Sequence, residues 1–111
     1  MKIFHNPRCS KSRETLSLIQ EQGIKPEIVE YLKTPPTVEE LKALLSLLTM
    51  RPRDIIRTKD ESFASLHLNL DDDAAVLVAL AQHPELLERA IVVRDGRAVV
   101  ARPPEKVRDL F

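Results

Sequence analysis

The stretch that decides the fold is "KIFHNPRCSKSRETLSLIQEQGIKPEIVEYL", residues 2–32. Its two ends, "KIF" (2–4) and "EIVEYL" (27–32), are rich in the residue types of short strands. Between them the sequence predicts a helix from about Ser10 to Gln22, which Gly23 ends. Because strand, helix and strand follow one another so closely, we expect a βαβ unit with two parallel strands.

The middle of the chain is predicted to be helical. Thr37 and Glu40 form a capping-box pattern at the start of a helix. The apolar residues that follow have helical spacing and are Leu41, Leu44, Leu45 and Leu48. The segment "RPRDIIR" (51–57) predicts a short helix, "DDDAAVLVALAQH" (71–83) a longer one, and "PELLERA" (84–90) one or two further turns.

The last third of the chain predicts a hairpin and a terminal helix. In "AIVVRDGRAVV" (90–100) two apolar runs flank Asp95-Gly96, a strong hairpin signal. The tail "PPEKVRDLF" (103–111) opens with two prolines and is expected to be helical. This order of elements is typical of an α/β, thioredoxin-like fold. We therefore expect one domain over residues 1–111, with a mixed four-stranded sheet flanked by helices and a helical insertion between the βαβ and ββα halves.

Composition narrows the class of protein. At 111 residues the chain is long enough for a core without metal or disulfide. Lys and Arg number 17, as do Asp and Glu, so the net charge is zero, which argues against bulk electrostatic binding to nucleic acid or membrane. One cysteine cannot form an internal disulfide, and neither a signal peptide nor a membrane-spanning apolar segment is evident. We expect a cytoplasmic protein, with monomer as the default.

The single cysteine, Cys9, falls where the first strand breaks and the helix begins. Unpaired N–H groups at a helix N-terminus favour a thiolate and form an anion site. Arg8, Lys11 and Arg13 add positive charge, and the hydroxyls of Ser10 and Ser12 can donate hydrogen bonds. A free cysteine is more often a small buried hydrophobe, but these polar neighbours favour a reactive thiol.

The spacing around Cys9 excludes some chemistry. The motif is C-x-x-S, because Ser12 stands where a resolving thiol would be, so an external thiol must reduce an oxidised Cys9. The phosphatase pattern of Cys, five residues and Arg fails, because Thr15 holds the arginine position. The histidines have no metal-ligand spacing with Cys9, so no metal site is expected; they are His5, His67 and His83.

Taken together, five motifs resemble the glutaredoxin-dependent arsenate reductase family over essentially the whole chain. They are "HNPRCSKSRETL" (5–16), "YLKTPPT" (31–37), "IIR" (55–57), "HPELLERAIVV" (83–93) and "RPPEKV" (102–107). The sequence is most similar to the branch of that family with the loop Asn-Pro-Arg-Cys-Ser-Lys-Ser-Arg. The resemblance implies a thioredoxin-like fold and the reduction of arsenate to arsenite.

The resemblance also implies site residues and partners. It puts the nucleophile on Cys9 and the three oxyanion-binding arginines on Arg57, Arg89 and Arg102. The residues that it implies for shaping the loop and supporting the thiolate are His5, Asn6, Ser12 and Arg13. It implies glutathione as a co-substrate, glutaredoxin as a partner, and no bound cofactor or metal.

Elementary chemistry agrees with this assignment. Arsenate, like a phosphate group, carries about two negative charges at neutral pH, and guanidinium groups bind such oxyanions bidentately. Taken alone, each arginine is more often a solvated surface charge.

Two features depart from the family pattern. Ala90 follows Arg89 where the family usually has the cis-proline of thioredoxin-like folds, and non-proline residues strongly prefer the trans peptide. The sequence therefore leaves open whether the peptide before Ala90 is cis or trans. Arg8 and Ser10 stand beside the thiol where smaller residues are usual, which bears on oxyanion preference.

Two alternatives stay open from the sequence. The first is a glutathione-linked thiol oxidoreductase that acts on another oxyanion or on protein mixed disulfides. The second is a non-enzymatic transcription regulator of the same superfamily that binds RNA polymerase. Such regulators carry C-x-x-C as a redox switch, and Ser12 removes that switch here.

Overall fold

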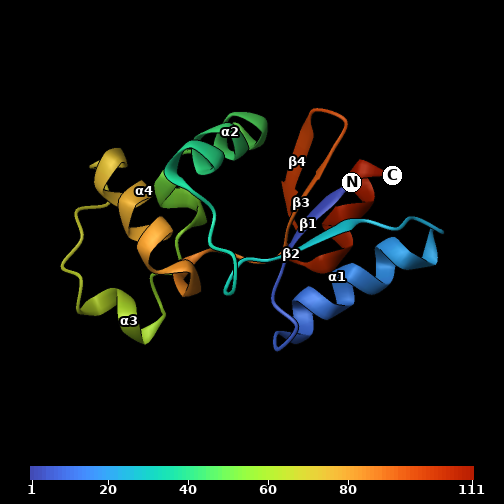
Figure 1. Cartoon of the computed structure of the whole chain (residues 1–111), viewed down its shortest axis with the longest axis horizontal. Helices are drawn as coiled ribbons and strands as arrows, with labels where there is room; N and C mark the ends of the chain where they lie inside the picture. The colour runs from blue at the N-terminus through green and yellow to red at the C-terminus, as the bar shows by residue number, and fades with distance from the viewer. The chain divides into compact units, whose positions relative to one another are not determined.

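The computed structural model describes all 111 residues, and the chain forms two compact units. Unit 1 combines both ends of the chain, Met1–Thr34 and Arg89–Phe111, and unit 2 is the intervening segment Pro35–Glu88. In Figure 1 the blue and red ends of the chain make up unit 1, and the green to orange segment makes up unit 2.

Unit 1 contains the predicted mixed sheet, in the order β2-β1-β3-β4. The strands are β1 (Lys2–His5), β2 (Glu27–Glu30), β3 (Ile91–Arg94) and β4 (Arg97–Val100). β1 pairs with β2 in parallel and with β3 antiparallel, and β3 pairs antiparallel with β4. Asp95 and Gly96 have φ values of 49° and 75°, the left-handed turn that an Asp-Gly hairpin requires. The predicted βαβ unit and hairpin are confirmed.

Two helices pack on this sheet, α1 (Ser10–Glu21) and η3 (Pro104–Leu110), a 3-10 helix. Their contact explains the core of unit 1. Ile3 and Val92 are register partners on neighbouring strands, and they are fully buried in one cluster with Ile19 of α1 and Val107 of η3. Each such side chain contributes about 1.5–3 kcal/mol when it leaves water. This packing fixes the start of α1 relative to the ends of the strands.

Unit 2 is helical, as predicted. Its elements are α2 (Val38–Leu48), η1 (Pro52–Ile55), α3 (Glu61–Ala64), α4 (Asp73–Gln82) and η2 (Pro84–Leu86). The capping box of α2 is confirmed: Glu40 N–H donates to Thr37 Oγ1 at 3.1 Å, and Thr37 N–H donates to Glu40 Oε1 at 3.3 Å. The leucine stripe of α2 is buried, and α2 packs against α4.

Two details of unit 2 differ from the prediction. The turns expected over 84–90 end at Leu86, because Leu87 is extended and pairs with Ile56 in an isolated bridge. The short helix α3 was not predicted; Asp60 caps it by accepting from Ser62 N–H at 3.0 Å.

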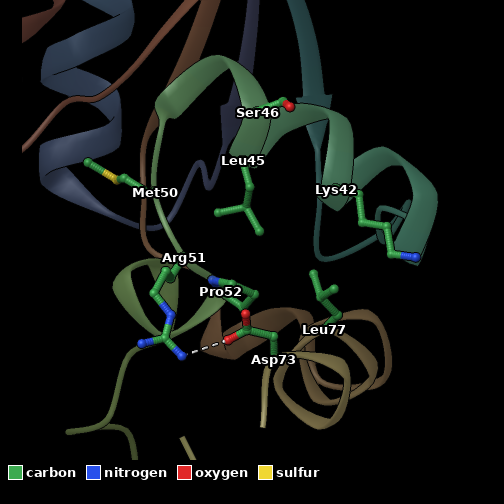
Figure 2. A pocket seen from close by; sticks show the side chains of 8 residues that line it. All are labelled: Lys42, Leu45, Ser46, Met50, Arg51, Pro52, Asp73 and Leu77. Atoms are coloured by element: carbon green, nitrogen blue, oxygen red, sulfur yellow. Dashed lines mark hydrogen bonds and ion pairs between the residues drawn. The ribbon is translucent and has the colours of Figure 1, made fainter. Parts of the chain in front are cut away.

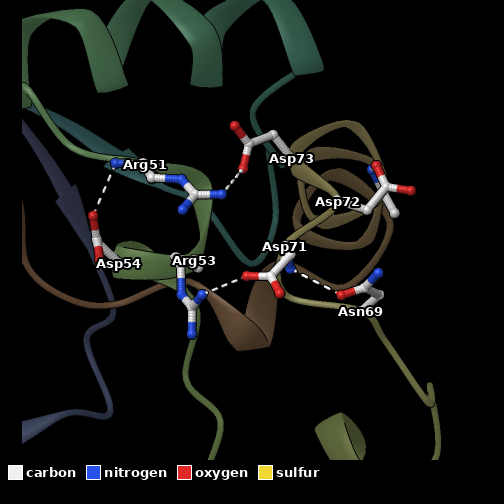
Figure 3. Close-up of polar contacts among 8 residues, drawn as sticks. Arg51, Arg53, Asp54, Asn69, Asp71, Asp72 and Asp73 are labelled. Carbon is white, nitrogen blue, oxygen red and sulfur yellow. Dashed lines mark hydrogen bonds and ion pairs between the residues drawn. The ribbon is translucent and has the colours of Figure 1, made fainter.

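Exposed ion pairs link η1 to the start of α4 (Figure 3). Arg51 Nη2 lies 3.1 Å from Asp73 Oδ1, and Arg53 Nη1 lies 2.7 Å from Asp71 Oδ1. Because such pairs contribute at most about 1 kcal/mol each in water, they orient the elements more than they stabilise them. None of the helices is both long and apolar enough to cross a membrane.

Candidate functional site

Three chain segments meet at one end of β1. The parallel register pairs His5 with Glu30, the last residues of β1 and β2. The residues that follow them, Asn6 and Tyr31, therefore lie side by side. The antiparallel register pairs Phe4 with Ile91, so Arg89 approaches Asn6 from the other side of β1. Cys9 follows within the same loop and begins α1. The sheet therefore gathers a thiol, a guanidinium group and a phenol at one edge.

Cys9 is the N-cap residue of α1, as the sequence predicts, and its side chain is half-buried. Its backbone is extended, with φ −95° and ψ 122°. Its N–H donates to Asn6 O at 3.0 Å, and its carbonyl accepts from Arg13 N–H at 3.0 Å. At an N-cap the side chain lies near the second and third N–H groups of the helix, which belong to Lys11 and Ser12.

These neighbours lower the pKa of the Cys9 thiol. Burial raises the pKa of Cys9, but the N–H of Ser12, the Arg89 side chain and the N–H of Lys11 outweigh it and hold the pKa below the ordinary value of 9.0. The sulfur makes no short capping hydrogen bond, so these donors act as electrostatic support for the thiolate. The pKa of Arg89 is raised in turn: burial lowers it, and the Cys9 thiolate and Tyr31 more than restore it.

Ser12 holds the loop from inside. It is fully buried, and its Oγ accepts from Asn6 N–H at 3.1 Å and lies 2.6 Å from His5 Nδ1. The pKa of His5 is lowered, mainly by burial and also by Arg13, against the opposing effect of Glu30. A neutral His5 can accept a hydrogen bond from the Ser12 hydroxyl at Nδ1, which satisfies both groups. The hydroxyl of Ser12 therefore holds the loop through His5 and Asn6, whereas its backbone N–H lowers the pKa of Cys9.

Two more predicted residues brace the loop. Asn6 Oδ1 accepts from Arg8 N–H at 3.0 Å, and Arg13 Nη1 donates to Pro7 O at 2.8 Å. The hydrogen bond from Arg13 to Pro7 O is exposed to solvent.

Tyr31 is a further neighbour of the thiol, and it was not among the predicted site residues. It is fully buried, and neither its hydroxyl nor the Nε of Arg89 has a hydrogen-bond partner of good geometry. Burial raises the pKa of Tyr31, while Arg89 and Asn6 lower it, so both lie close to the phenol. Its sequence signals are its place at the end of the strand predicted over 27–32 and at the start of the motif "YLKTPPT" (31–37), and neither indicates a contact with the thiol.

The peptide between Arg89 and Ala90, whose isomer the sequence leaves open, is cis. Ala90 is fully buried. Its carbonyl accepts from Ala101 N–H at 2.8 Å, which ties it to the end of the hairpin. The Arg102-Pro103 peptide is also cis.

Arg102 lines a cavity of about 310 Å³ with Lys11, Pro103 and Pro104. Lys11 is exposed and forms a loose ion pair with Glu14 at 3.8 Å. Two cations from separate segments thus border one hollow at the N-terminal end of α1.

Arg57 belongs to unit 2. Its Nη1 lies 3.4 Å from Asp60 Oδ2 and from the carbonyl of Glu85, and its N–H donates to Leu86 O at 2.6 Å. The structure thus describes Arg57 as a partly buried side chain paired with a carboxylate.

Unit 2 also has a cavity of its own, of about 320 Å³ (Figure 2). Arg51 and Asp73 form an ion pair at its wall, and Met50 lies at the exposed rim. It holds no thiol or imidazole that could act as a nucleophile or base. No group of three or more His, Cys, Asp or Glu residues in the chain could hold a metal ion.

The model of the ArsC family matches residues 4–110. The chain belongs to the ArsC family. This ArsC-family chain is 51% identical to a protein of Neisseria meningitidis serogroup A named arsenate reductase, over 96% of this chain and 94% of that one. It is 45% identical to the uncharacterized Escherichia coli protein YfgD, over 99% and 95%.

Solved structures agree with this ArsC-family assignment. The structure of an arsenate reductase from Vibrio cholerae is 46% identical and superposes with a TM-score of 0.92, over 99% of this chain and 96% of that one. The resemblance and the thioredoxin-like fold are therefore confirmed.

Proposed function

We propose that this protein is a glutathione- and glutaredoxin-dependent arsenate reductase in which Cys9 is the nucleophile. The observation that carries the proposal is the meeting of the half-buried Cys9 thiol with Arg89 and the first N–H groups of α1. Both lower the pKa of the thiol, and both remain suited to an anion once the thiolate has reacted.

The first step is attack of the Cys9 thiolate on arsenic. A sulfur–arsenic bond forms, and an arsenate oxygen leaves as water after it takes up protons. The N–H groups of Lys11 and Ser12 and the guanidinium of Arg89 stabilise the charged adduct, which is electrostatic preorganisation. Arg102 supplies a further cation from the segment before η3. The role of Arg57 stays a prediction from the family resemblance.

The second step is reduction by glutathione. The glutathione thiolate attacks the Cys9 sulfur, a disulfide forms, and the electron pair of the breaking sulfur–arsenic bond reduces As(V) to As(III), which leaves as arsenite. Glutaredoxin then attacks the glutathione sulfur and releases the Cys9 thiolate. An external thiol is needed, because the chain has no second cysteine.

The test is arsenate-dependent NADPH oxidation, coupled through glutathione reductase, glutathione and glutaredoxin. Saturable turnover is expected, and Cys9→Ser should abolish it. Turnover that persists in Cys9→Ser would rule out the mechanism.

A second candidate is a thiol oxidoreductase with a different oxyanion or a protein disulfide as substrate. The exposed Arg8 beside Cys9 favours it, since extra charge at the thiol alters which anions bind. Protection of Cys9 from alkylation by arsenate, phosphate and sulfate, measured side by side, separates the two candidates. Strong protection by arsenate together with turnover supports the first candidate, and protection without turnover supports the second.

A further inference from the structure

Two buried polar atoms beside Cys9, the Tyr31 hydroxyl and Arg89 Nε, have no hydrogen-bond partner of good geometry, although the two side chains lie close to each other. Buried polar groups in folded proteins are nearly always hydrogen-bonded, and each one left unpaired costs about 1–3 kcal/mol. Unpaired groups that persist at one place need an explanation specific to that place. Here the place is the edge of the sheet where the reactive thiol stands.

The sheet register brings these two groups together. Tyr31 follows β2 and Arg89 precedes β3, and both strands pair with β1, so the two residues flank Asn6 from opposite sides. The two groups are also chemically complementary, because Nε–H can only donate and a phenol oxygen can accept. The phenol stays neutral, since burial raises its pKa.

We propose that Tyr31 is a positioning residue for oxyanion binding: its hydroxyl oxygen accepts the Nε–H of Arg89 when an anion is bound at Cys9. The bond fixes the plane of the guanidinium group and leaves its terminal N–H groups for the anion. Arginine binds oxyanions through such paired N–H groups, so their orientation determines the affinity. Tyr31 does not touch the anion, because its hydroxyl is covered by protein.

This inference rests on the proposed oxyanion site but not on turnover of arsenate. Its test is therefore a binding measurement: protection of Cys9 from iodoacetamide by arsenate and, separately, by phosphate. Tyr31→Phe removes only the hydroxyl. We expect the concentration that gives half-protection to rise about tenfold, the effect of one hydrogen bond to a charged group.

Thermal unfolding of the same variant separates positioning from a structural role. Because Tyr31→Phe removes a buried hydroxyl that makes no hydrogen bond of good geometry, its melting temperature should stay unchanged or rise while oxyanion affinity falls. The matched control is Thr15→Val, which removes another fully buried hydroxyl, one that donates to Lys11 O at 2.9 Å within α1. The control should melt earlier and keep wild-type protection.

Three results would overturn the inference. They are wild-type protection in Tyr31→Phe, a melting temperature that falls together with the affinity, and the absence of oxyanion protection in the wild-type protein. If arsenate protects the wild-type thiol but is not reduced, the proposed function fails while the role of Tyr31 is still decided. If arsenate is reduced, the KM for arsenate should rise in Tyr31→Phe and the KM for glutathione should not.

Discussion

The substitution Ser12→Ala removes one oxygen atom on which two buried groups depend. Ser12 Oγ accepts the Asn6 N–H at 3.1 Å and lies 2.6 Å from His5 Nδ1. Ser12 itself is fully buried, and His5 and Asn6 are nearly so. Alanine keeps the helix and its backbone N–H groups but supplies no acceptor or donor at this position.

The cost follows from the groups left behind. A buried donor or acceptor that loses its partner costs about 1–3 kcal/mol, so two of them cost about 2–6 kcal/mol. The space of one hydroxyl admits little water, but relaxation of the loop recovers part of the loss, which leaves about 2–3 kcal/mol. At roughly 4 °C per kcal/mol for a domain of this size, the melting temperature should fall by about 10 °C.

Urea unfolding followed by circular dichroism gives the free energy of unfolding directly. The matched control is Ser17→Ala, an exposed serine on the same helix, which should change that free energy by less than about 0.5 kcal/mol. If Ser12→Ala is no less stable than Ser17→Ala, the two hydrogen bonds do not hold the loop and the reasoning is refuted.

Three further predictions concern charge and capping. Arg89→Ala should raise the pKa of Cys9, seen as an upward shift in the pH profile of its alkylation, because a cation that favours the thiolate is lost. The folded protein should lose stability in urea as pH falls below about 6.5, because the pKa of His5 is lowered and the unfolded chain binds that proton more readily. Thr37→Ala should cost about 1 kcal/mol in the same assay, because the capping box of α2 loses its side-chain acceptor.

Each of these has a control. Arg8→Ala, a change at an exposed arginine next to the thiol in sequence, should shift the Cys9 profile less than Arg89→Ala does. His5→Gln should reduce the acid sensitivity of stability, whereas an unchanged pH dependence would contradict the assignment of that sensitivity to His5. Thr34→Ala, at an exposed position outside any helix, should leave the free energy of unfolding nearly unchanged.

The fold was predictable where local patterns agree with tertiary packing. The βαβ unit, the Asp-Gly hairpin and the capping box of α2 each carry a signal within a few residues, and the structure confirms them. The four-residue helix α3 was not predictable, because it has no buried residue and so no apolar periodicity. The early end of η2 has another cause: Leu87 pairs with Ile56, a contact between distant residues.

The site was predictable in part. Helix-start signals place Cys9 at the N-cap, and the structure agrees. The charges nearest in sequence suggested Arg8, Lys11 and Arg13 as the source of thiolate support. The structure confirms the predicted support from backbone N–H groups at the start of α1, but the side chain that lowers the pKa of Cys9 is Arg89. A contact across the sheet has no local sequence pattern.

Unit 1 is assembled from both ends of the chain, with Arg89 lying 80 positions after Cys9 (89 − 9). During synthesis the thiol therefore leaves the ribosome long before β3, β4 and the arginine that lowers its pKa exist. Closing so long a loop is slow compared with local helix formation. The nascent chain therefore lacks the contribution of Arg89, and the pKa of Cys9 reaches its final, lowered position only after residues 89–111 have been made.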